Sequence, residues 1–562
     1  MRRVRGFLLV SFAAVIASGL ILRGQSVSPL VILDVGLPAV TEGTIPDQTH
    51  RPYSPQAIYK AGIHSPNDLA RTSRSGRTFS AGRVIVKFRD DLSDSARDAA
   101  IRSVVVDGVR QPRNASADFD VVTMNPGTDG EAIATAFRAR TDVEYAQAPY
   151  RVHALFVPND PYYASMQWNL PLINLESAWD IQLQAGSAMT VAVVDTGMAY
   201  MNATLNVNIV AFVDELGNAH PALGPQVIPY SAADQLVGGG HANRIVAPHD
   251  FIWNTNTPLD FDGHGTHVSG TIGQLTNDRA GTAGVAFNVK LMPVKVLASD
   301  WDVAFGGAPF VGGTDDEVAL GVRYAADNGA NVINMSLGSS GPPNCGTVPN
   351  QDGCSPVLEA AIRYAVGKGS FVVVAGGNEA ETPDPEFGLN PTSVIAEIAS
   401  RVSGAVSVAA VDRRAVGQTG TRRCTGDPSL PDCHAYYSSF GNYIELSAPG
   451  GSERGFGRDG YVWQETFDFN FTDTFDPDIS PTYGPPRFDM LAIVGYIGTS
   501  MAAPHVSGVA AMMMQQGIKN PAAIEAALEQ FAVDLGPAGR DPNYGYGLVD
   551  ARAVLRGLGL AR

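Results

Sequence analysis

From residue 159 onward, short apolar runs alternate with longer stretches of helical periodicity, and Gly-rich turns separate them. Continuous apolar strands that alternate with helices are typical of a parallel sheet covered on both faces. The pattern therefore predicts an α/β domain, in which ligands bind at the carboxyl ends of the strands. The strand-like runs are Met189–Val194, Val289–Leu297, Asn331–Met335, Phe371–Ala375 and Ala405–Val411.

A smaller pattern precedes this domain. Its runs alternate between strand-like and helical periodicity in the order β-α-β-α-β, which predicts a small α+β domain over residues 81–152. Residues 25–80 are rich in Pro, Ser and Thr without sustained periodicity, which is typical of a poorly ordered linker. The runs of the small domain are Gly82–Phe88, Asp94–Val104, Phe119–Met124, Gly130–Arg140 and Val143–Tyr150.

The amino terminus has the layout of a secretory signal peptide. Three arginines within Met1–Arg5 precede an apolar run over Phe7–Leu22. An uncleaved membrane anchor is the alternative, but it needs roughly 20 apolar residues, more than this run supplies. We therefore expect a signal peptide over residues 1–24, a secreted (extracellular or periplasmic) product, and no membrane association after cleavage.

The cysteines and the charge agree with export. Cys345 and Cys354 enclose one short polar loop, and Cys424 and Cys433 enclose another. Two local disulfides are the interpretation, although four cysteines allow three connectivities, and the lack of CxxC spacing disfavours a metal site. The formal net charge of −17 excludes nucleic acid as an expected partner, because it would repel a phosphate backbone.

Four polar residues stand where such a fold would place chemistry. Asp195 directly follows the apolar run ending at Val194, and Asn378 follows a strand-like run and two glycines. His264 lies between glycines, and Ser500 stands at the start of a small-residue helix. Each feature alone has an ordinary explanation: a capped turn, a metal-binding or core histidine, a helix N-cap.

Taken together and in order, the motifs VVDTG, GHGTHVSG, NMSLG, AGGN and GTSMAAPHVSG resemble those of the subtilisin-like (S8) serine peptidases. The resemblance covers Asn159–Gly557. It implies a doubly wound, mostly parallel α/β sheet with helices on both faces, forming a peptidase domain over residues 158–557. It also implies a serine endopeptidase that acts on proteins or peptides as a monomer.

The same resemblance implies roles for individual residues. Ser500 would attack the scissile carbonyl, His264 would transfer the proton, and Asp195 would orient the imidazole. Asn378 would contribute to the oxyanion hole, and no cofactor would be needed for catalysis. The implied substrate-binding residues are Ser336, Leu337 and Gly338 on one side and Ala375, Gly376 and Gly377 on the other.

Residues 81–152 resemble the inhibitor-type propeptide of this family, an α+β domain of ferredoxin-like topology. The segments GRVIVKF and VEYAQAPY carry the likeness. It implies a precursor that processes itself near Arg151–Pro161 and a propeptide that acts as an intramolecular inhibitor.

Some features depart from the family pattern. Insertions near residues 201–258 and 461–490 are expected to form surface loops, and the second could shape access to substrate. The loop Thr276-Asn277-Asp278 resembles a structural calcium site, while Ala222 stands where an Asp ligand would be expected. A non-catalytic secreted scaffold and a narrow-specificity processing protease are the alternative functions.

Overall fold

The structure is a computed structural model, in which the described residues form two compact units. The predicted signal peptide, Cys345, Cys424 and the start of the expected processing region lie outside the described residues. The predicted disulfides therefore stay a prediction. The structure describes residues 70–72, 78–112, 116–150, 156–342, 353–381, 391–413, 433–476, 479–480 and 482–557.

The smaller unit is a four-stranded antiparallel sheet with two helices, and its strand order is β4-β5-β3-β6. Ser93 and Asp129 cap the helices by accepting hydrogen bonds from backbone N–H groups of the first turns. The order confirms the expected ferredoxin-like topology and adds β4, which is too short to give a pattern. The elements are β3 (Arg83–Phe88), α3 (Asp94–Val104), β4 (Val109–Arg110), β5 (Asp120–Thr123), α4 (Gly130–Arg138) and β6 (Val143–Gln147).

The end of the predicted linker differs from expectation. Strand β1 (Ala70–Thr72) pairs antiparallel with β2 (Thr78–Ser80), so the segment ends in a short hairpin.

The larger unit contains a seven-stranded parallel sheet in the order β12-β13-β7-β14-β16-β18-β19. Five of its strands coincide, within two residues at each end, with the apolar runs of the sequence, which confirms the predicted α/β sheet. The strands are β7 (Thr190–Asp195), β12 (His249–Asp250), β13 (Lys290–Lys295), β14 (Val332–Met335), β16 (Phe371–Ala375), β18 (Ala405–Val411) and β19 (Leu446–Pro449).

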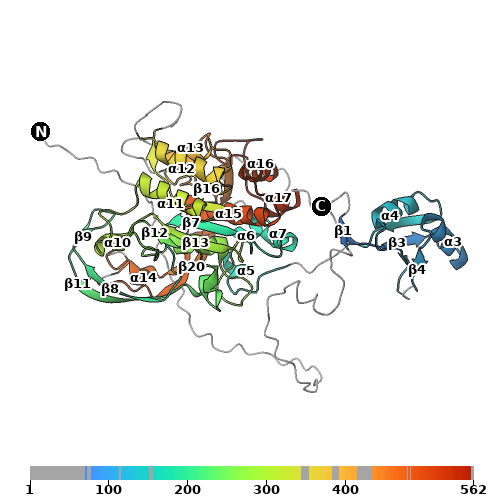
Figure 1. The fold of residues 1–562 in the computed structure, drawn as a ribbon, viewed down its shortest axis with the longest axis horizontal. Helices are drawn as coiled ribbons and strands as arrows, with labels where there is room; N and C mark the ends of the chain where they lie inside the picture. The colour runs from blue at the N-terminus through green and yellow to red at the C-terminus, as the bar shows by residue number, and fades with distance from the viewer. Residues whose placement is uncertain are drawn as a thin grey trace, which may run out of the picture. The chain divides into compact units, whose positions relative to one another are not determined.

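Helices cover both faces of this sheet because successive side chains of a strand point to opposite sides. Ala192 and Val194 pack with α11 (Asp315–Asp327), α12 (Pro356–Gly367) and α13 (Val394–Ala399). Val191 and Val193 belong to the other core. There the helices include α9 (His264–Gly273), α15 (Thr499–Gln515), α16 (Pro521–Phe531) and α17 (Ala551–Gly557), and Figure 1 shows α15 beside strand β7.

The two insertions are folded rather than simple surface loops. In the first, β8 (Ala203–Ile209) pairs antiparallel with β11 (Gly224–Tyr230). In the second, β20 (Val462–Phe467) pairs antiparallel with β21 (Leu491–Tyr496), which directly follows the insertion. The ring centroids of Tyr230 and Phe467 lie 5.5 Å apart, so the insertions pack against each other.

Shorter elements complete both insertions and the loop after β13. These elements are β9 (Phe212–Val213), β10 (Ala219–His220), α8 (Asp234–Val237), α10 (Asp300–Ala304) and α14 (Phe469–Thr472).

Among the helices that the structure describes, none combines the length and the apolar character needed to span a membrane.

Candidate active site

Asp195 is the last residue of the interior strand β7 and is fully buried. One of its oxygens, Oδ1, accepts hydrogen bonds from the Thr196 N–H at 2.8 Å and from the His264 ring nitrogen Nδ1 at 2.7 Å. Its second oxygen has no hydrogen-bond partner within the described part of the chain. A buried carboxylate without a cation beside it is costly, so the imidazole is its principal stabilising partner.

His264 is placed by two glycines in unusually close contact with their surroundings. Gly263, at the N-cap of α9, has a φ of 111°, which favours glycine. A Cβ at Gly265 would lie 2.3 Å from the Gly197 carbonyl oxygen. The glycines around His264 therefore allow the turn after β7 to pack directly against the first turn of α9.

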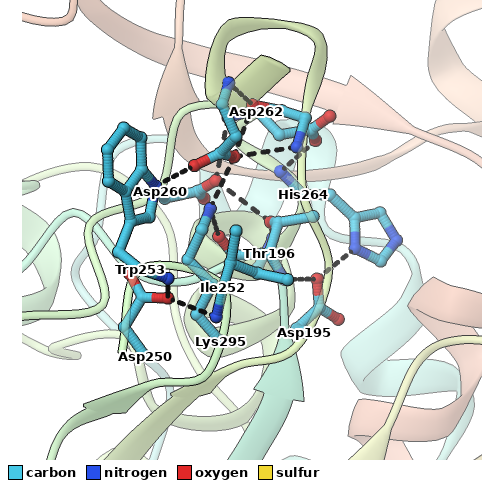
Figure 2. Close-up of polar contacts among 12 residues, drawn as sticks. Asp195, Thr196, Asp250, Ile252, Trp253, Asp260, Asp262, His264 and Lys295 are labelled. Carbon is cyan, nitrogen blue, oxygen red and sulfur yellow. Dashed lines mark hydrogen bonds and ion pairs between the residues drawn. The ribbon is translucent and has the colours of Figure 1, made fainter. Parts of the chain in front are cut away.

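Asp260 holds the loop that carries His264 (Figure 2). One oxygen accepts from the N–H groups of Asp262 and Gly263 and from the Thr196 hydroxyl, and the other accepts from Thr266 through its N–H and hydroxyl. Sequence reasoning missed this role. The available signal was an Asp four residues before the histidine, a position from which a side chain can bond nearby backbone groups.

The electrostatic surroundings favour the protonated form of His264. Burial lowers the pKa of the ring, but the charge of Asp195 and its hydrogen bond raise it, and Asp262 and Asp260 add to the increase. The result is a pKa of about 9.

The second histidine of the motif is structural. The Nε2 of His267 lies 3.1 Å from the Val462 carbonyl oxygen and 3.2 Å from that of Val494, and its ring stacks on Tyr496 at 4.4 Å. Burial lowers the pKa of His267 to about 3, with a contribution from His264, so the ring is neutral and bound between two strands. Zinc ligation by this pair of histidines has no support from this geometry.

Ser500 is the second residue of α15, two positions after the N-cap residue Gly498, whose φ is 151°. Its hydroxyl donates to the Ser336 carbonyl oxygen at 3.2 Å, and the Ser336 hydroxyl donates to the Ser500 carbonyl oxygen at 2.8 Å. The positive end of the helix lies beside this hydroxyl, where it would stabilise developing negative charge.

Asn378 follows β16 and has its amide fixed in one orientation. Its oxygen accepts from both the N–H and the hydroxyl of Thr499, each at 2.9 Å. The Nδ2 group is therefore left as a donor, and no described residue accepts a hydrogen bond from it. Asn378 lines a cavity of about 220 Å³ together with His264 and Ser500.

The predicted substrate-binding segments lie next to these groups. Ser336, Leu337 and Gly338 directly follow β14, and Ser336 contacts Ser500 as described above. Ala375 ends β16, and the N–H of Gly377 donates to the Thr499 hydroxyl at 3.1 Å. The structure thus brings both segments to the turn that carries Ser500, while their contact with substrate stays a prediction.

The calcium expectation concerns the loop at Thr276-Asn277-Asp278. The two carboxylate oxygens of Asp160 accept hydrogen bonds from the N–H groups of Asn277 and Asp278, at 2.8 and 3.3 Å. This contact shapes the loop by itself. The Asp160 carboxylate, which could otherwise coordinate calcium, is occupied here by backbone N–H groups. Calcium binding at this loop stays a prediction.

A carboxylate, an imidazole and a hydroxyl beside an amide donor are the residue types of a serine hydrolase. The sequence profile of the Subtilase family matches residues 186–547, and that of the Fervidolysin N-terminal prodomain matches residues 65–148. The chain belongs to the subtilase family. It is a subtilisin-like serine peptidase with a prodomain, as the motifs predicted.

Named relatives span most of the chain. It is 27% identical to the "Thermophilic serine proteinase" of Bacillus sp. (strain AK1), over 88% of this chain and 93% of the relative. It is 29% identical to "Thermitase" of Thermoactinomyces vulgaris, over 68% and 94%. It is 30% identical to an "Extracellular protease" of Xanthomonas campestris pv. campestris, over 85% and 71%.

Proposed function

We propose that the chain is the precursor of a secreted serine endopeptidase whose catalytic triad is Asp195, His264 and Ser500. One observation carries the proposal. The Nδ1 of His264 lies 2.7 Å from the Asp195 carboxylate, and its ring lines one cavity with Ser500 and Asn378.

The proposed reaction begins with a rotation of the Ser500 side chain. Its hydroxyl leaves the Ser336 carbonyl oxygen and turns toward His264. Because the Asp195 carboxylate accepts from Nδ1, the neutral ring carries its proton there, and Nε2 is the base that takes the Ser500 proton during attack. His264 then gives that proton to the leaving amine, and water hydrolyses the acyl-enzyme by the same steps in reverse.

Negative charge develops on the carbonyl oxygen of the substrate during both steps. The Nδ2 group of Asn378 and the backbone N–H of Ser500 are the proposed donors for it. Thr499 holds the Asn378 amide through its oxygen before substrate arrives, so little reorganisation is needed at the moment of reaction.

The prodomain and the relatives support the wider proposal. We infer that residues 81–152 inhibit the enzyme until self-cleavage near Arg151–Pro161 separates them, as an inhibitor-type prodomain implies. Two relatives carry names that describe them as extracellular, which supports secretion.

The test compares the full chain with a Ser500→Ala variant. We expect the parent to remove its prodomain and to hydrolyse casein, and the variant to remain a precursor without activity. A parent that folds but cleaves neither itself nor casein would favour the non-catalytic scaffold. Retained processing in the alanine variant would mean that another protease matures the chain.

A further inference from the structure

The cavity beside the catalytic groups carries acidic side chains that the proposed reaction does not use. Glu215 comes from the turn between β9 and β10, Asp300 begins α10, and Asp473 directly follows α14. Three separate segments, two of them within the insertions, thus direct carboxylates into the space next to His264 and Ser500.

These carboxylates lack cationic partners. Among the residues that the structure describes, no Lys, Arg or His lies within ion-pair distance of Glu215, Asp300 or Asp473. Asp214 provides the contrast, because it also lines the cavity but binds the His220 ring at 2.9 Å.

Asp300 is the most informative of the three. The residue is only 9% exposed, and one oxygen accepts from the Glu215 N–H at 3.0 Å. Its other oxygen has no hydrogen-bond partner in the described part of the chain. Burial raises the pKa of Asp300 to about 8, with the charge of Glu215 next in importance. A cationic ligand would relieve this unfavourable arrangement.

The rest of the lining suits a long side chain with a charged end. Aromatic rings line the cavity beside the carboxylates, namely Phe261, Trp301, Phe469, Phe475 and Tyr496. Such rings pack against methylene groups and attract a guanidinium or ammonium group.

A bound metal ion fits less well. The described residues form one group of three acidic or histidine ligands with atoms within 4.8 Å of one another, and that group is Glu445, Glu525 and Glu529, outside this cavity. The carboxylates of the cavity are therefore too dispersed for a compact calcium shell.

We propose that this cavity is a substrate subsite that binds the side chain of an arginine or lysine next to the scissile bond, with Asp300, Glu215 and Asp473 supplying the negative charge. The inference rests on the proposed function and adds a substrate class to it. It favours a peptidase that selects basic sequences over one that cleaves broadly after large uncharged side chains.

The test uses mature enzyme from the full chain and internally quenched peptides. One position at a time, on either side of the cleaved bond, carries arginine or its uncharged isostere citrulline. We expect kcat/KM to favour arginine about tenfold at one position, the scale of a hydrogen-bonded charge. The ratio should fall toward one in the Glu215→Gln, Asp300→Asn double variant and fall partly in Asp473→Asn.

Asparagine at 300 can still accept from the Glu215 N–H, which favours correct folding of the variant. Asp315→Asn, on the exposed first turn of α11, removes one negative charge elsewhere, as Asp473→Asn does in the cavity, and should keep the arginine preference. Cleavage without discrimination, or a preference that persists in the double variant, overturns the inference alone. Failure of the parent to cleave any peptide overturns the proposed function.

A metal ion is the competing occupant, and the same double change in the Ser500→Ala background tests it. Calcium that raises the unfolding temperature of the Ser500→Ala enzyme, but not of that enzyme carrying the double change, would assign the cavity to the ion and overturn the inference. Equal responses of both proteins to calcium and to EDTA, together with the arginine preference, support it.

Discussion

His264 experiences opposing influences on its charge. The base in the proposed reaction must be neutral, yet the carboxylates around the ring raise its pKa to about 9. Activity should therefore fall as the pH falls through that pKa, because protonation removes the base. A pH optimum on the alkaline side follows for an enzyme whose imidazole is surrounded by acids.

Replacing Asp262 by Asn tests the origin of that pKa. Asparagine can still accept the hydrogen bond that Asp262 receives from the His264 N–H at 2.9 Å, but it lacks the negative charge. The pKa of His264 should decrease, so the acidic limb of the kcat/KM profile should move to lower pH. Asp262→Glu, which keeps the charge, should leave the limb near its original place, and an unmoved limb in the Asn variant would contradict the assignment.

The proposed oxyanion role of Asn378 is tested by a variant that removes the donor and keeps the shape of the side chain. Asn378→Asp retains the oxygen that Thr499 contacts but replaces the free Nδ2 donor by a negative oxygen. For Asn378→Ala we expect kcat to fall by a factor of about 10²–10³, the magnitude known for the corresponding change in subtilisin. The kcat of Asn378→Asp should fall at least as far. Steady-state kinetics check this, and a raised KM with an unchanged kcat would contradict a role confined to the transition state.

At the scale of elements, the contact between the turn after β7 and the start of α9 fixes the geometry of Asp195 and His264. A methyl group at position 265 has no room, since it would lie 2.3 Å from the Gly197 carbonyl oxygen. Gly265→Ala should destabilise the protein by about 1–3 kcal/mol through overpacking. Urea unfolding in the Ser500→Ala background measures this without self-digestion.

Gly367, the last residue of α12, is the matched control for that substitution. A Cβ there meets no atom within 4 Å. Gly367→Ala should be neutral or stabilising by up to about 1 kcal/mol, because alanine favours the helix more than glycine does. Equal effects of the two substitutions would show that the close contact at Gly265 is unimportant.

The length and burial of each strand determined whether the sequence could predict it. The long apolar strands β7, β13, β14, β16 and β18 were predicted because burial on both faces makes their pattern continuous. The edge strands β12 and β19 were missed because they are short and depend on pairing with a neighbour for their conformation. Fixed motifs identified Asp195, His264, Asn378 and Ser500, and the structure brings all four together at the carboxyl ends of the strands.

The acidic cavity could not be predicted from the sequence. Glu215, Asp300 and Asp473 lie in segments without a shared motif, and only the folding of the two insertions directs them to one place. The sequence patterns of the two insertions predicted surface loops, because a short antiparallel hairpin is indistinguishable from a polar loop until its partner strand is known. Asp260 was missed for a related reason, since its function is to bond backbone groups.

At the scale of the whole molecule, the two units have cores of very different size. The catalytic unit buries side chains on both faces of a seven-stranded sheet. The small unit depends on a single cluster of apolar residues: Val84, Val86, Phe88, Ala100, Ile101, Val105, Val122, Met124, Ala134, Phe137, Val143 and Ala146. The inhibitory role proposed above would benefit from this difference, because a domain of low stability is readily digested after release.

The small unit should therefore fold alone, but only marginally. Residues 78–150, expressed as a separate fragment, should unfold cooperatively in urea with a free energy of unfolding of about 3–5 kcal/mol or less, the usual limit for a single core of this size. Phe137 is fully buried, and its ring meets that of Phe88 at 6.2 Å, so Phe137→Ala should cost about 3–5 kcal/mol and unfold most of the fragment. Circular dichroism measures both. A fragment that tolerates Phe137→Ala would have a more robust core than these contacts provide, and the proposed loss of the prodomain after self-cleavage would then need another cause.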